Sequence, residues 1–447
     1  MHSNTWETFG LHIPEILVPA GTCDYQKWAV VACDQYTSEP EYWKEVEEIV
    51  GSAPSALRMM LPELYLEKPG EAERIAAIRE TMQRYLSDGT LRSLGRGCML
   101  VRRTAEGRSR MGLVIATDFD QYDFSADSTS LTRATEGTVV ERIPPRLRIR
   151  EGAPLEMPHI LILIDDPEKT VIEPLANAPG TPIYDTELMM NGGHISGTFI
   201  NEEDLEPMRS ALSALYASAC EQYGKDRVIF QAMGDGNHSL ATAKTAWEAI
   251  KASLTPEEAA VHPARYALCE IENIHDPGIV FEPIHRAIFA KAGQSGSELL
   301  EEVAAILRAQ NGSTQLIPDG SYDPVIHTPA PSCDGVSSCF DIPYRIAGDA
   351  GHLIIHQAHG KLAVGVLQNA IDVLVKEQGR ADVDYIHGEH ALARIAARPG
   401  AAGFLLPSMD KSELFPAIAS DGALPRKTFS MGEANEKRYY IECRSLI

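Results

Sequence analysis

Short apolar runs alternate along the chain with longer segments whose apolar residues recur at helical spacing. Val228 to Met233 is one such run, and it leads within a few residues into a helical pattern from Ser239 to Ala252. Short apolar runs are typical of buried strands, whereas helical spacing indicates amphipathic helices. The two kinds of segment follow one another in mixed order, which favours an α/β or α+β fold without strict alternation. We therefore predict irregular mixed sheets with flanking helices.

The individual elements follow from the same periodicities. Helices are predicted over residues 39–50, 71–86, 205–223, 239–252, 297–310, 369–377 and 390–398. Strands are predicted over residues 28–33, 98–102, 111–116, 159–164, 228–233, 266–271, 353–355, 361–366 and 403–406. Ser38 is the expected N-cap of the first helix, because a serine side chain accepts a hydrogen bond from the first turn.

A chain of 447 residues is long enough for two or three domains, each with its own core. We predict an N-terminal α/β region at 1–155, a phosphate- or nucleotide-binding α/β region at 156–310 and a C-terminal α+β region at 311–447. Residues 311–340 are rich in Pro, Ser, Asp and Gly, which is typical of a linker or a long loop.

The charge balance narrows the classes of partner. Lys and Arg number 40 against 63 Asp and Glu, which gives a formal net charge of −23. That balance disfavours nucleic acid and anionic membranes, since both attract dense cationic surfaces. A small anionic substrate remains compatible, because a few local cations and backbone N–H groups outweigh a distant negative surface. We expect a small-molecule substrate and leave a homo-oligomer open.

The chain also shows features of a cytoplasmic protein. Its first residues lack the basic and apolar stretches of a secretory signal, and no apolar run approaches the roughly 20 residues that span a bilayer. The 8 cysteines are scattered and form no C-x-x-C pair, a pattern that in a long chain indicates reduced thiols rather than disulfides or a zinc site.

The strongest motif joins the predicted strand 228–233 to the predicted helix 239–252 through Gly234-Asp235-Gly236-Asn237-His238. The two glycines permit positive φ and let a ligand approach the backbone. The start of the helix offers N–H groups and partial positive charge, which suit a phosphate. In this interpretation Asp235 holds a metal or accepts a proton, and His238 donates to a phosphoryl oxygen. The alternative is a plain connection in which Asp235 or Asn237 only caps the helix.

Two further positions are candidates. Asp34 follows the predicted strand 28–33, and α/β enzymes place ligand-handling side chains at the carboxyl ends of strands. Asp34 is therefore a candidate base or metal ligand, with a plain Asx-turn as the alternative. His285-Arg286 is a candidate phosphate-binding pair, and a purely structural role is equally open.

Several separated segments resemble one family. Phe230-Gln-Ala-Met-Gly-Asp-Gly-Asn-His-Ser-Leu-Ala-Thr-Ala-Lys244 looks like the signature of the bacterial and archaeal family called domain of unknown function 1015. Val30 to Trp43, and Asp276 to Val280 followed by His285-Arg286, resemble further motifs of that family. The resemblance extends over most of the chain.

The general members of that family carry Asp-Gly-His-His-Arg where this chain has Asp235-Gly236-Asn237-His238-Ser239. That version resembles the turn of the ParB/sulfiredoxin-like superfamily, whose members bind nucleotide phosphates there and one branch of which phosphorylates free serine. The resemblance implies a ParB/sulfiredoxin-like phosphate-binding turn at Gly234 to Ser239, with His238 on the phosphates. Ser239 is a departure, because it removes the cation that would pair with phosphate. Arg142, Arg286 and Arg426 are candidates to replace that cation.

The segment 133–142 resembles the family's segment in which a His-Glu pair precedes Thr and a downstream Arg, although Ala134-Thr135 does not reproduce the His. The resemblance implies that Glu136 is a general base for a substrate hydroxyl and that Arg142 neutralises phosphate. A solvated charged loop is the alternative.

Together these features predict a small-molecule phosphotransferase. The phosphates of ATP or ADP, with Mg²⁺, would bind residues 234–239, and Glu136 or Asp34 would activate a hydroxyl substrate such as serine. The reverse reaction would start from phosphoserine. Two alternatives stay open: a non-catalytic nucleotide-binding protein, favoured by the Ser239 departure, and a metal-assisted phosphatase or other hydrolase that uses the carboxylates.

Overall fold

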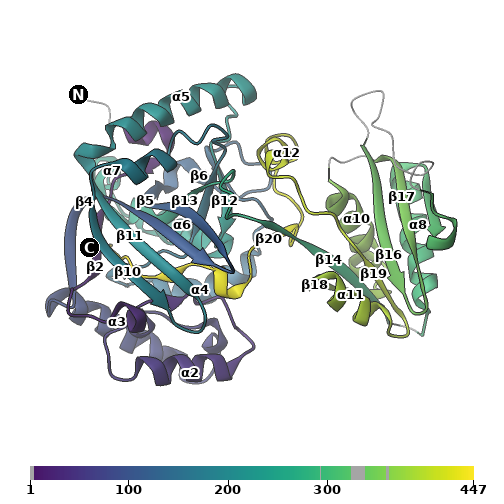
Figure 1. Ribbon diagram of the computed structural model, residues 1–447, viewed down its shortest axis with the longest axis horizontal. Coiled ribbons are helices and arrows are strands. Elements are labelled where there is room, and N and C mark those ends of the chain that lie inside the picture. Colours follow the sequence, from purple (N-terminus) through teal and green to yellow (C-terminus); the bar gives the residue numbers. More distant parts are fainter. Residues whose placement is uncertain (1–4, 292, 324–337, 359–361) are drawn as a thin grey trace. The chain divides into compact units, whose positions relative to one another are not determined.

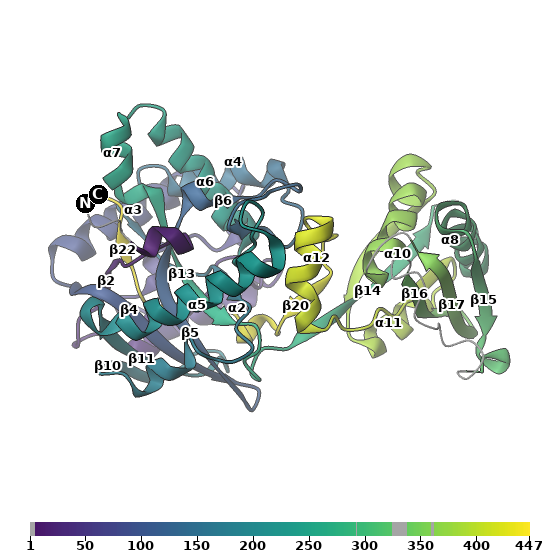
Figure 2. The same ribbon diagram turned by 90° about the horizontal axis from the view of Figure 1, so that it is seen from above.

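A computed structural model describes residues 5–291, 293–323, 338–358 and 362–447 (Figure 1 and Figure 2). Contacts within the chain form two compact units, one of Met1–Val280 with Met431–Ile447 and one of Phe281–Ser430. Neither unit ends at residue 155 or 310, and the division into three regions stays a prediction. The predicted phosphate-binding turn lies in the first unit.

The first unit is built on a large mixed sheet. Its strands lie in the order β10 (Thr181–Leu188), β11 (Gly193–Asn201), β4 (Leu91–Ala105), β5 (Arg108–Asp118), β13 (Tyr266–Asn273), β9 (Leu161–Ile164), β12 (Gln231–Asp235), β7 (Thr132–Arg133) and β6 (Tyr122–Asp123), with β1 (Leu11–His12) also on β5 and β2 (Glu15–Pro19) also on β4. The pairs β13–β9, β12–β7 and β7–β6 are parallel, and the central pairs β4–β5, β5–β13 and β9–β12 are antiparallel. The predicted mixed α/β fold class is thereby confirmed.

Hydrophobic cores cover both faces of this sheet. Successive side chains of a strand point to opposite faces, so one strand contributes to both cores. In β5, Val114 packs into one hydrophobic core, and Leu113 and Ile115 pack into another. Helices α2 (Pro40–Val50) and α3 (Glu71–Ser87) contribute to the first core, and α5 (Glu206–Tyr223) and α6 (Asn237–Lys251) contribute to the second. Figure 1 shows α3 and α5 on opposite sides of the strands.

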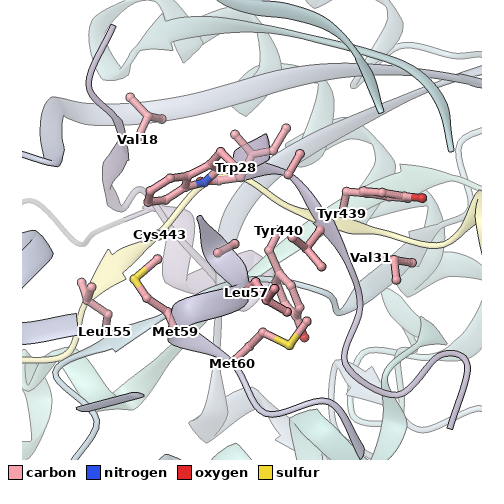
Figure 3. Packing of buried hydrophobic residues seen from close by; sticks show 14 of the residues in the cluster. Val18, Trp28, Val31, Leu57, Met59, Met60, Leu155, Tyr439, Tyr440 and Cys443 are labelled. Carbon is pink, nitrogen blue, oxygen red and sulfur yellow. The ribbon is translucent and has the colours of Figure 1, made fainter. Parts of the chain in front are cut away.

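The last residues of the chain complete the first unit. β21 (Tyr439–Tyr440) pairs with β3 (Val30–Val31), and β22 (Arg444–Ser445) pairs with β8 (Leu155–Glu156), both antiparallel. The Nε1 of Trp28 donates a hydrogen bond to the Ile441 carbonyl over 3.1 Å. Figure 3 shows Trp28, Tyr440 and Cys443 packed with Met59 and Met60 in one buried cluster. The C-terminal segment is therefore part of the core that surrounds the predicted site.

The second unit has an antiparallel sheet of its own. Its strands lie in the order β15 (Thr314–Pro318), β17 (Asp349–Ala358), β16 (Ser338–Ile346), β19 (Ala401–Phe404), β14 (Phe281–Ala290) and β18 (Ala381–His387), with β20 (Phe429–Met431) on β14. Helices α8 (Gly296–Asn311) and α10 (Ala363–Asp372) pack on this sheet through buried side chains that include Leu299, Val303 and Leu367. α11 (Glu389–Ala396) and α12 (Leu414–Asp421) follow along the chain.

Most predicted helices are confirmed with small shifts at their ends, namely α2, α3, α5, α6, α8 and α11. Three details are wrong. Ser38 is not the N-cap of α2, which begins at Pro40 after Glu39. The strand predicted over 28–33 is reduced to Val30–Val31, because Trp28 ends the short helix α1 (Tyr25–Trp28).

The third detail is the strand predicted over 361–366. Residues 363–366 begin α10 instead, because a short apolar run satisfies the buried face of either element. Residues 359–361 lie outside the described residues. Of the linker predicted over residues 311–340, residues 324–337 also lie outside them, and β15 lies near the linker's start. In the described ranges, none of the helices combines the length and apolar character that crossing a membrane requires.

Replacing Ile441 with alanine is expected to destabilise the first unit by about 2–5 kcal/mol, because this fully buried side chain would leave a cavity. All 4 tryptophans lie in this unit, at positions 6, 28, 43 and 247, so tryptophan fluorescence during urea unfolding measures it selectively. Val261→Ala, at a position that is 79% exposed, is the control and should leave the midpoint unchanged. Equal midpoints for Ile441→Ala and the unsubstituted protein would show that the C-terminal segment is not part of this core.

Candidate functional site

The predicted turn is a sharp connection between β12 and α6. Gly236 is the residue just before α6 and has a φ of 82°, a conformation that favours glycine. An added Cβ would lie 3.2 Å from the Ile160 Cα at Gly236, and 2.8 Å from the Met431 sulfur at Gly234. Gly236 is therefore favoured by its backbone conformation, and both glycines lie close to neighbouring atoms.

One backbone N–H of this turn, that of Gly236, already has a hydrogen-bond partner within the turn. The Gly236 N–H donates to the Asp235 carboxylate over 2.9 Å. Beyond it, α6 begins without a side-chain cap from its N-cap residue. The Oδ1 of Asn237 is buried and has no hydrogen-bond partner among the described residues. An unmatched buried acceptor costs about 1–3 kcal/mol, so a ligand that donates there would recover that cost.

Asp235 faces a cation that the sequence patterns do not single out. The Nζ of Lys437, from the C-terminal segment, lies 3.1 Å from the Asp235 Oδ2. Burial raises the pKa of the Asp235 carboxyl, but the Lys437 ammonium and the Gly236 N–H outweigh burial and hold that pKa below its ordinary value. Lys437 thus places a positive charge at the turn, where Ser239 stands in place of the arginine.

His238 is tied to the loop that carries Glu136. The His238 Nε2 accepts a hydrogen bond from the Val139 N–H over 3.2 Å. An imidazole whose Nε2 accepts carries its proton on Nδ1, so Nδ1 is the nitrogen that could donate to a phosphoryl oxygen. Glu136 is half-buried three residues before Val139. The structure therefore brings the loop of Glu136 to the start of α6, as the prediction requires.

The remaining predicted residues have contacts of their own. The Asp34 carboxylate accepts from the Gln35 side chain over 3.0 Å. Arg142 is exposed at the end of the short 3₁₀ helix Val140–Arg142. Arg286 belongs to the second unit, where its buried guanidinium donates to Gln368 and to the Ile284 carbonyl. Arg286 is therefore engaged within its own unit, and Arg426 belongs to that unit too.

Ser239 takes part in a hydrogen-bonded chain that sequence reasoning missed. The Ser239 Oγ lies 2.6 Å from the His159 Nε2, and the His159 Nδ1 lies 2.8 Å from the Tyr440 hydroxyl. The Cys33 N–H donates to the same hydroxyl over 3.3 Å. His159 lies just before β9 and Tyr440 in β21, so no spacing in the sequence connects either of them with Ser239.

A cavity of about 150 Å³ adjoins the hydrogen-bonded side chains of Ser239, His159 and Tyr440. Its polar walls include Ser239, His159, Tyr440 and Thr242, and its apolar walls are rich in methionine and leucine. Asp34, Glu136, Arg142, Asp235 and His238 are not among its lining residues. The cavity therefore reaches the turn through Ser239.

The described part of the chain holds no group of three or more His, Cys, Asp and Glu side chains that could bind a metal ion. The Asp235 carboxylate already contacts the Lys437 ammonium and the Gly236 N–H. This arrangement does not fit a bound metal ion, because the Lys437 ammonium neutralises the Asp235 carboxylate. A metal role for Asp235 stays a prediction.

Replacing Lys437 with methionine is expected to lower the unfolding free energy by about 1–3 kcal/mol at neutral pH, since Asp235 loses its cation. The folded-state pKa of Asp235 is depressed, so this stabilisation is present above the unfolded-state pKa near 3.9 and is lost as the pH falls through the folded value. Urea unfolding from neutral to acidic pH measures the difference. In the Asp235→Asn background the same substitution should have little effect; a difference that does not change with pH contradicts the pairing.

Comparisons with known proteins place the chain in a family. No curated protein matches it. Solved structures similar to it include a free serine kinase in complex with AMP (11% identity, covering 74% of this chain and 92% of that chain, TM-score 0.37). A second similar structure is a conserved hypothetical protein from Pyrococcus furiosus, with 10% identity, coverage of 74% of this chain and 95% of that chain, and a TM-score of 0.35. A third is SbnI with a C-terminal truncation from Staphylococcus aureus, with 8% identity, coverage of 71% of this chain and 82% of that chain, and a TM-score of 0.34. Likenesses this distant carry no inference about the site.

The family model gives a firmer result. The model described as "Protein of unknown function (DUF1015)" matches residues 17–368, which is most of the chain and includes the turn. The resemblance noted in the separated sequence motifs is thereby confirmed. The chain belongs to the DUF1015 family.

Proposed function

We propose that the protein is a small-molecule phosphotransferase, which binds a nucleotide at residues 234–239 and phosphorylates a small hydroxyl compound such as serine, or runs the reverse reaction from phosphoserine. The observation that carries the proposal is the turn itself: Gly236 at positive φ leads directly into the uncapped start of the 15-residue helix α6. Such turns suit phosphate, because N–H groups and the positive end of the helix dipole point at the anion.

Two side chains would supply the charge stabilisation that phosphoryl transfer depends on. Lys437, held 3.1 Å from Asp235, provides the cation for which the family's turn uses arginine. His238, the second residue of α6, has its Nε2 held by the Val139 N–H. In the proposed reaction both groups stabilise negative charge on the transferred phosphoryl group.

Of the two candidate bases, the contact between Val139 and His238 favours Glu136. The substrate oxygen would bond to the terminal phosphorus as the bond from that phosphorus to the rest of the nucleotide breaks, which leaves ADP from ATP or AMP from ADP, and Glu136 would take the hydroxyl proton. That transfer needs the carboxylate within about 3 Å of the hydroxyl. Mg²⁺ would arrive with the nucleotide, on phosphate oxygens and water, and no step is assigned to a resident metal.

The direct test incubates the pure protein with ATP or ADP, Mg²⁺ and L-serine and measures phosphoserine. Activity is expected in the unsubstituted protein and should fall about 100-fold in His238→Ala and in Glu136→Gln. The control is Lys376→Met in the second unit, where the lysine side chain is 69% exposed and turnover should not change.

Other outcomes separate the alternatives. Nucleotide binding without phosphoserine, with His238→Ala binding more weakly, identifies a nucleotide-binding protein and rejects catalysis. Release of phosphate from phosphoserine without a nucleotide identifies a phosphatase. Full phosphoserine formation by both His238→Ala and Glu136→Gln would reject the roles given to these residues.

A further inference from the structure

Ser239 and His159 meet at the wall of the 150 Å³ cavity. The distance of 2.6 Å between the Ser239 Oγ and the His159 Nε2 is that of a hydrogen bond between a hydroxyl and an imidazole. A nucleophile within hydrogen-bond reach of a base, which a third group orients, is the structural signature of nucleophilic catalysis. The hydroxyl of Tyr440, 2.8 Å from the His159 Nδ1, is the third group here.

The Tyr440 hydroxyl orients the ring of His159. The Tyr440 hydroxyl accepts a hydrogen bond from the Cys33 N–H over 3.3 Å and lies 2.8 Å from the His159 Nδ1. In the tautomer with the proton on Nδ1, His159 donates to the Tyr440 oxygen, and its Nε2 accepts the Ser239 proton. Burial raises the pKa of Tyr440 far above its ordinary value, so the hydroxyl stays protonated.

Cys33 also lines the cavity but is not its nucleophile. Burial raises the pKa of the Cys33 thiol, and a neutral thiol is a poor nucleophile. Ser239, by contrast, has a base in contact with its hydroxyl, and it lies in the first turn of α6, where the positive end of the helix dipole favours developing negative charge.

The cavity walls indicate the class of substrate. Met59, Met60, Leu61 and Met157 supply much of the lining. The charged groups there are paired with one another, Arg146 with Glu63 and Arg150 with Glu156. A cavity of about 150 Å³ accommodates a group the size of benzene. It therefore suits a small apolar group of up to roughly six carbon atoms.

We propose that Ser239 is an acyl-accepting nucleophile for esters of small apolar acids, with His159 as its general base and Tyr440 as a positioning residue. The Ser239 Oγ bonds to the ester carbonyl carbon while the His159 Nε2 takes the hydroxyl proton. The bond from that carbon to the alcohol oxygen then breaks, and the leaving alcohol takes the proton from His159. Water attacks the acyl-serine in the same way, which releases the acid and restores Ser239.

This activity goes beyond the phosphotransferase and needs no nucleotide, so the two are tested separately. The first probe is a fluorophosphonate, which bonds to an activated serine with loss of fluoride, applied to the full-length protein and followed by peptide mass spectrometry. Labelling is expected at Ser239 and should disappear in Ser239→Ala. Ser213→Ala is the control, because that hydroxyl only donates to the Arg209 carbonyl within α5. The labelled residue is identified by mass spectrometry on the unsubstituted protein. Absence of label on Ser239 there overturns the proposal even where a variant does not fold.

The second measurement is hydrolysis of 4-nitrophenyl esters of increasing acyl length. Butanoate is expected to react faster than dodecanoate, and His159→Gln should lower kcat by about 100-fold. Tyr440→Phe should lower kcat more than it raises KM, since the lost hydroxyl orients His159 while the ring stays in the cavity wall. Equal rates for both esters, or an unchanged kcat in His159→Gln, contradict the assignment.

Discussion

The candidate site depends on the buried ion pairs that hold the C-terminal segment against the large sheet. Arg438 is only 2% exposed, and it pairs with Glu270 of β13 and with Glu442, both buried. Removing such charges from water costs several kcal/mol per ion, so each is tolerated only while its partners are in place. Docking of Arg438 fixes its neighbours, with Lys437 beside Asp235 and Tyr440 beside the cavity.

One short turn thereby serves two different surroundings. On one side, Asp235 and Lys437 form a polar, charged corner beside the start of α6. On the other side, Ser239 faces an apolar cavity through its contact with His159. A polar turn with an anion site and a neighbouring apolar pocket can bind a ligand that has both kinds of group.

Local chemistry explains what the sequence predicted. The turn was predictable because Gly236 requires a positive φ between a strand pattern and a helix pattern. Lys437 and His159 could not be found in the same way, since they reach the turn from segments far away in sequence and nothing in their local pattern distinguishes them. The fold shows the same limit: 361–366 is apolar enough for either element, and packing against α8 within the second core selected the helix. Ser38 does not cap α2, because the helix begins two residues later, at Pro40.

Hydrogen–deuterium exchange on the full-length protein, with and without ADP, tests the central claim most directly. The claim is that the backbone at the start of α6, together with Lys437, receives phosphate. Slower exchange is expected in peptides that cover residues 234–244 and 431–440, with little change in the second unit. Unchanged exchange in both peptides at an ADP concentration that saturates binding, or protection confined to other segments, would contradict it.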